Sequence, residues 1–198
     1  MTNLPTEKNW DSFWETNTDS RFTKLSWSKR RIINILDKLL KPGMNVLDAG
    51  SGSGFFSSYF IAKKCKVYPL DYSKDALKIT RRLTQGQAQE YIQADLLDPE
   101  LGKKYSKQFD LIFTDGLFEH FEPKDQLKIM GNFKLVKRSN GIIATFVPNK
   151  YSWWEVIRPF FMPGIVEVPF TMNKLTELHN GLEIISSGGI NVIPLPIS

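Results

Sequence analysis

Short apolar runs alternate along this chain with stretches whose apolar residues recur every three to four positions. Several of the apolar runs are continuous and end at an acid, which is typical of buried parallel strands. The strands predicted in this way cover residues 44–48, 66–71, 91–95, 109–115 and 141–147. Helical periodicity between the runs predicts crossover helices. We therefore expect an α/β fold with a mostly parallel sheet and helices on both faces.

The helices are predicted from the spacing of their apolar residues. Trp10, Phe13 and Trp14 stand at i, i+3 and i+4, so we expect a short N-terminal helix with an aromatic face. A second stripe over 32–39 ends at Pro42, which cannot continue a helix. Later helices are predicted around 56–60, from Ser73 as N-cap, from Pro123 to about Arg138, and over 171–180.

The pattern changes after the fifth predicted strand. Residues 151–170 are rich in aromatic side chains and are broken by three prolines. Residues 182–187 are predicted to form a sixth strand. For a seventh strand two readings stay open: residues 190–195 supply it, or the chain is a fragment that stops short of it.

A glycine-rich turn follows the first predicted strand, where residues 46–55 read V-L-D-A-G-S-G-S-G-F. Such a turn between a strand and a helix lets a ligand lie against backbone that carries no Cβ. The dinucleotide fingerprint requires G-x-G-x-x-G, but Phe55 occupies the third glycine position. The spacing therefore argues against an NAD-dependent oxidoreductase.

Acids follow at the ends of the later strands. Asp71 lies about twenty residues beyond the turn, where a carboxylate can accept hydrogen bonds from both hydroxyls of a ribose. Asp95 and Asp115 end the next two strands, and residues 116–121 read G-L-F-E-H-F. Together with D-x-G-x-G-x-G at the turn, this order resembles the class I S-adenosylmethionine (SAM)-dependent methyltransferases over about 41–149. The last string resembles their type 11 small-molecule branch.

The resemblance implies a Rossmann-like class I fold, SAM as cofactor and S-adenosylhomocysteine as product. It puts Asp48 near the methionine part of SAM and Asp71 on the ribose. It places Tyr72 beside the adenine, with Asp95 and the Leu96 N–H hydrogen-bonded to that ring. The residues expected to contact the cofactor are Asp48, Gly50, Ser51, Gly52, Gly54, Phe55, Asp71, Tyr72, Asp95, Leu96, Asp115 and Gly116.

One domain over 1–198 is expected, with a helical cap at 1–40 and a cofactor-binding core at 41–149. Residues 150–198 are expected to shape the acceptor pocket and to carry the C-terminal strand region. An apolar segment broken by prolines cannot continue the sheet, so it must pack or cover something. A cover that excludes water suits methyl transfer, and ligand pockets are mostly apolar. The residues expected to line the acceptor pocket are Trp10, Trp14, Phe118, Trp153 and Trp154.

The acceptor is expected to be a small molecule, apolar or aromatic, with an anionic group drawn to Arg158 or Lys150. His120 is the candidate general base because the ordinary pKa of histidine is near neutral; its alternative role is structural. Glu119 could join His120 in a metal site. The sequence shows no further ligand cluster, so we expect no metal.

Composition limits the partners. The net charge is +5, and the basic pairs are scattered, which indicates separate solvated helix faces rather than a nucleic-acid surface. Peripheral contact with an anionic membrane stays open, as does the oligomeric state. Cys65 is the single cysteine, and we find no apolar run of signal-peptide or membrane-span type. We expect a cytoplasmic protein.

Two alternatives to a small-molecule methyltransferase stay open. One is a methyltransferase that acts on protein or RNA, although the N-P-P-Y-type motif of amino-methylating nucleic-acid enzymes is absent from residues 147–149. The other is a binding module that holds SAM without catalysis, because a fold alone does not establish a function.

Overall fold

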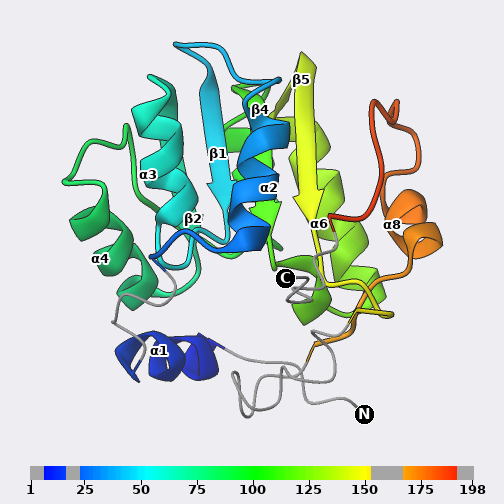
Figure 1. Cartoon of the computed structure of the whole chain (residues 1–198), viewed down its shortest axis with the longest axis horizontal. Helices are drawn as coiled ribbons and strands as arrows, with labels where there is room; N and C mark the ends of the chain where they lie inside the picture. Colours follow the sequence, from blue (N-terminus) through cyan, green and yellow to red (C-terminus); the bar gives the residue numbers. More distant parts are fainter. Residues whose placement is uncertain (1–6, 17–22, 153–166, 191–198) are drawn as a thin grey trace, which may run out of the picture.

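A parallel sheet in the order β3-β2-β1-β4-β5 forms the centre of the protein in a computed structural model that describes residues 7–16, 23–152 and 167–190. Its strands are β1 (Asn45–Ala49), β2 (Lys66–Asp71), β3 (Ile92–Gln93), β4 (Phe109–Asp115) and β5 (Lys137–Phe146). Every neighbouring pair is parallel, so the carboxyl ends of the strands meet at one edge (Figure 1). The predicted α/β architecture is confirmed.

Helices cover both faces of this sheet. They are α1 (Glu7–Thr16), α2 (Trp27–Leu36), α3 (Phe55–Ala62), α4 (Lys74–Leu83), α5 (Glu100–Lys104), the 3₁₀ turn η1 (Phe118–His120), α6 (Pro123–Val136) and α8 (Met172–Leu178). The predicted cap is present, since the Ser73 hydroxyl accepts a hydrogen bond from the Ala76 N–H at 3.3 Å. Pro123 stands at the start of α6, as expected. No helix of the described ranges is long and apolar enough to cross a membrane.

Alternate residues of β1 belong to two different cores. Val46 packs in a cluster with Ile32 of α2 and Phe60 of α3. Its neighbour Leu47 faces the opposite side, in a cluster with Phe133 of α6. A strand buried on both sides explains the continuous apolar run that predicted it.

Helix α1 lies beyond the carboxyl ends of the strands, at the bottom of the view in Figure 1. Its Trp14 is only 8% exposed and packs with Ala76 and Ile79 of α4. The aromatic face predicted for this helix therefore covers the edge of the sheet where ligands of such folds bind.

The prediction of a sixth strand over 182–187 is wrong, since these residues form no strand. Ile184 and Ile185 are adjacent, so an extended backbone points them in opposite directions, and both are exposed. Without a neighbouring strand in the described residues, an apolar run of this length has nothing to pair with. Ile190 is outside any strand, and the rest of the proposed seventh strand lies outside the described residues.

Smaller differences concern element boundaries. β3 ends at Gln93 rather than Asp95, because the Asp95 carboxylate accepts a hydrogen bond from the Leu97 N–H at 2.8 Å and turns the chain. β5 begins at Lys137 rather than at residue 141, with an irregular register opposite Phe109. Helix α5 is too short to give a periodic signal and was not predicted.

Candidate functional site

The glycine turn leads directly from β1 into α3. Gly52 and Gly54 both have positive φ, at 49° and 76°. A Cβ at Gly54 would lie 2.7 Å from the Cα of Thr80, and one at Gly52 would lie 2.8 Å from the ring of Trp14. The turn therefore requires glycine both for its backbone conformation and for the close packing of α4 and α1 against it.

Hydrogen bonds hold this turn to the end of β2. The N–H groups of Gly50 and Ser51 both donate to the Leu70 carbonyl, at 2.8 and 3.0 Å. The Thr80 hydroxyl donates to the Gly52 carbonyl at 3.0 Å. The turn is thus fixed before any ligand binds.

Asp71 is part of the same network. One carboxylate oxygen accepts from the Gly52 N–H at 2.8 Å, and the other accepts from the Ser73 N–H at 2.9 Å. A carboxylate oxygen can accept more than one hydrogen bond, so these two contacts do not by themselves exclude the expected ribose role. The sequence predicted the ribose role, whereas the support of the glycine turn emerged only from the fold.

Asp48 lies behind the turn and is 3% exposed. Burial, together with the negative charges of Asp71 and Asp115, raises the pKa of its carboxyl to about 7, against the opposing effect of the hydrogen bond from Ser57. The Ser57 hydroxyl of α3 donates to the carboxylate at 2.5 Å, so the side chain is held in place.

Asp115 ends β4 on the wall of the cavity described below, where its side chain stays exposed. Partial desolvation by the neighbouring protein raises the pKa of its carboxyl to about 6, and the charge of Lys29 opposes this. Lys29 comes from α2, and burial lowers its pKa to about 8. Its ammonium lies 4.2 Å from the centre of the Phe55 ring. Nothing local in the sequence shows that α2 turns Lys29 toward β4.

The loop expected at the adenine is anchored by a residue that the sequence analysis missed. The Asn132 side chain of α6 donates to the carbonyls of Leu96 and Asp98, at 2.8 and 3.1 Å. Asn132 is buried, and its only sequence signal is a polar residue among the buried positions of α6. The half-exposed Tyr72 side chain stands nearby on the cavity wall.

A cavity of about 1420 Å³ joins these groups along the carboxyl edge of the sheet. Of the predicted cofactor residues, its wall includes Asp48, Gly50, Ser51, Gly52, Phe55, Asp71, Tyr72, Asp95, Leu96, Asp115 and Gly116. The wall also includes Trp10, Trp14 and His120. Gly54 is not on it, because this residue caps α3 and faces Thr80.

The predicted acceptor pocket is only partly reproduced. Phe118 is fully buried and packs against Phe133 at 6.0 Å between ring centres, so its side chain lies in the core rather than on the cavity wall. Trp153 and Trp154 lie outside the described residues, as does Arg158. Of the predicted aromatic wall, Trp10 and Trp14 reach the cavity.

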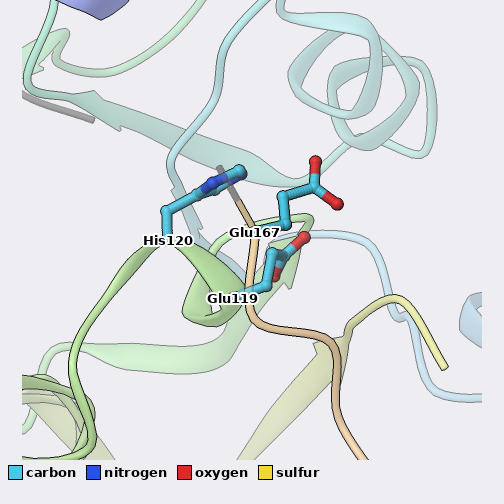
Figure 2. Close-up of side chains that lie close together, drawn as sticks. All are labelled: Glu119, His120 and Glu167. Atoms are coloured by element: carbon cyan, nitrogen blue, oxygen red, sulfur yellow. The ribbon is translucent and has the colours of Figure 1, made fainter. Parts of the chain in front are cut away.

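Three buried side chains on the cavity wall lie close together (Figure 2). Glu119, His120 and Glu167 each offer one ligand atom, and these atoms lie within 4.8 Å of one another. The sequence pointed to Glu119 and His120 but not to Glu167, which a separate segment of the chain contributes. The expectation of no metal rested on the lack of a further ligand, and the fold supplies one.

Comparison with known proteins bears on this arrangement. A protein-family model described as "Methyltransferase domain" matches residues 40–175, more than half of the chain. The chain belongs to this methyltransferase family. The match runs from before β1 into the first half of α8 and includes the glycine turn and all the acids described above.

Relatives of this methyltransferase domain have different acceptors. It is 29% identical over 113 residues to a ribosomal protein L11 methyltransferase of Dictyoglomus turgidum, covering 56% of this chain and 34% of the relative. It is 36% identical over 100 residues to a malonyl-[acyl-carrier protein] O-methyltransferase of Hamiltonella defensa, covering 50% and 35%. The chain therefore spans about a third of the length of these curated relatives.

The fold of this methyltransferase domain has solved counterparts. A SAM-dependent methyltransferase from Anabaena variabilis superimposes with a TM-score of 0.70 at 18% identity, over 94% of this chain and 85% of that one. The predicted class I methyltransferase superfamily is confirmed, with SAM as the cofactor of that superfamily. The type 11 branch stays a prediction.

Proposed function

We propose that this chain transfers a methyl group from SAM to a small-molecule acceptor. The observation that supports this most is that one cavity wall gathers the glycine turn and the strand-end acids of a methyltransferase-family domain. In this proposal the glycine turn receives the methionine part of SAM. Asp71 receives the ribose, and Asp95 with the Leu96 N–H receives the adenine.

Methyl transfer from SAM does not require a side chain to activate the methyl donor. The sulfonium of SAM is already activated, so the protein must hold the acceptor in line with the S–CH₃ bond and exclude water. The rigid turn serves the first task. Helix α1 serves the second, because it lies beyond the carboxyl ends of the strands (Figure 1) and its Trp10 and Trp14 line the cavity.

The acceptor end of the cavity is acidic in the described part of the chain. Its wall includes Asp115, Glu119, Glu122 and Glu167. Carboxylates repel an anionic group, so they favour a neutral or cationic acceptor, or one held through a bound cation. The anionic acceptor group expected from the sequence fits this wall less well.

A macromolecular acceptor is the second candidate, because one relative is a ribosomal protein methyltransferase. The two candidates differ in which fraction would receive the methyl group. Incubation with methyl-labelled SAM and separated small-molecule, protein and RNA fractions distinguishes them by where the label appears.

Calorimetric titration tests the cofactor assignment directly. SAM and S-adenosylhomocysteine should each bind with one site per chain, and NAD should not bind. NAD binding without SAM binding would overturn the proposal. SAM binding with no label transferred to any fraction would indicate the non-catalytic binding module.

A further inference from the structure

We propose that Glu119, His120 and Glu167 bind one divalent metal ion at the acceptor end of the cavity. Two of these residues come from η1 after β4, and the third comes from the segment that precedes α8 (Figure 2). The three are 1%, 8% and 8% exposed, respectively. Metal binding itself is independent of the function proposed above.

The distances suit a shared ion. Nitrogen and oxygen ligands lie about 2.0–2.2 Å from Zn²⁺, so two ligands of one ion are at most about 4.4 Å apart. The ligand atoms here lie within 4.8 Å of one another. Small rotations of the two glutamate side chains are enough to close the remaining gap.

The segments that carry the ligands are fixed to each other. The Val168 N–H donates to the Glu119 carbonyl at 2.8 Å, which joins the two ligand-bearing segments next to the ligands. The Gln126 side chain donates to the carbonyls of Phe118 and Phe121, both at 2.8 Å, and so holds η1 from both sides. A site prepared in this way loses little backbone freedom when an ion binds.

The ligand types indicate which ion. Ca²⁺ and Mg²⁺ favour oxygen ligands, whereas imidazole suits first-row transition ions. One imidazole with two carboxylates therefore points to the series from Mn²⁺ to Zn²⁺. Three protein ligands leave coordination positions open, as catalytic metal sites do and structural ones do not.

The location suggests what the open positions hold, and this step rests on the proposed function. A carboxylate oxygen of Glu119 lies 3.4 Å from where a Cβ on Gly116 would stand, so the cluster adjoins the end of β4. A hydroxyl oxygen bound to the ion loses its proton to water more readily, because the ion stabilises the resulting anion. That oxygen then forms the O–CH₃ bond while the S–CH₃ bond breaks and its electron pair returns to sulfur. The acceptor would be a hydroxyl compound that coordinates the ion.

Zn²⁺ and Mn²⁺ titrations test the site on the full chain, with any affinity tag removed and the protein first dialysed against a chelator. One equivalent should bind, with Mg²⁺ weaker than either. Glu167→Gln keeps the side-chain shape and removes a charged ligand. The affinity for the metal ion should therefore fall more than about 100-fold, which exceeds the usual effect of losing a residue that only hydrogen-bonds to a ligand. Glu122→Gln removes an acid from the same cavity wall outside the cluster, and should leave the affinity unchanged.

Each variant is also titrated with SAM, and its melting is recorded to show that it folds. Glu119→Gln provides a second test if Glu167→Gln melts early. Absence of binding at millimolar ion, or equal affinity in the folded variants and the wild type, overturns the metal site. If the wild type binds the metal ion but does not bind SAM, the proposed function is overturned and the metal site stands.

Discussion

At the scale of single residues, Asp71 combines two tasks that the sequence could not show together. Its carboxylate supports the glycine turn through Gly52 and faces the cavity where the ribose is expected. Asp71→Ala should weaken SAM binding by about 1.5–3 kcal/mol, the scale of hydrogen bonds to a charged group. The melting temperature should fall as well, because the Gly52 and Ser73 N–H groups lose their acceptor.

Asp75→Ala is the matched control for this prediction. Asp75 is four positions further along and pairs with Lys78 at the surface of α4, so its loss should change neither SAM affinity nor melting by much. Calorimetry with both variants gives the comparison. Equal SAM affinity in Asp71→Ala and the wild type would remove Asp71 from the ribose site.

Two glycines give opposite expectations for the same substitution. Gly54→Ala places a methyl group 2.7 Å from the Thr80 backbone at a residue with φ of 76°, so it should lower the melting temperature and weaken SAM binding. Gly131 lies within α6, and a Cβ there meets nothing within 4 Å. Gly131→Ala should therefore stabilise the protein by about 0.4–1 kcal/mol. Thermal melting of both variants checks the signs.

At the scale of elements, helix α1 can be tested through Trp14, which contacts the glycine turn and α4. Trp14→Ala should lower SAM affinity several-fold and reduce the melting temperature, because it opens the cover and leaves a large buried gap. Leu127→Ala, at a residue of α6 that is 61% exposed, should change neither quantity. If SAM affinity is unchanged in Trp14→Ala, the helix covers the edge without supporting the cofactor site.

The sequence predicted the elements whose signals are local. β2 and β4 are continuous apolar runs that end at Asp71 and Asp115, and both were placed with the observed bounds. The sixth strand failed because an apolar run cannot show whether a neighbouring strand exists. Glu167 and Asn132 were missed because their roles depend on contacts with η1 and with the loop after β3, which only the folded chain brings near them.

At the scale of the whole molecule, the raised pKa values of two acids, the buried Asp48 and the cavity-facing Asp115, predict how stability depends on pH. The folded pKa values of Asp48 and Asp115 are raised to about 7 and about 6, above the ordinary value of 3.8. Between about pH 4 and 7 these two groups therefore bind more protons in the folded protein than in the unfolded chain. Its stability should fall as the pH rises through this window. Asp48→Asn should flatten the fall, because the amide stays neutral and can still accept the hydrogen bond from Ser57.

Melting temperatures measured from pH 4 to 8 for the wild type and Asp48→Asn check this sign. Asp75→Asn serves as control, since it changes the same residue type on the surface of α4. A wild type whose stability rises steadily from pH 4 to 7 would show that Asp48 is ionised in the folded protein with an ordinary or lowered pKa.

Helix α1 touches both ends of the cavity with two side chains one turn apart. Trp14 lies against Gly52 of the cofactor turn, and the Trp10 ring stands edge-on to the His120 ring at 4.8 Å between centres. If SAM binding displaces Trp14, the same helix carries the displacement to the His120 side. By thermodynamic reciprocity, the factor by which SAM then alters the affinity for the acceptor equals the factor by which the acceptor alters the affinity for SAM. The SAM affinity measured with and without the acceptor would therefore show whether α1 couples the two binding steps.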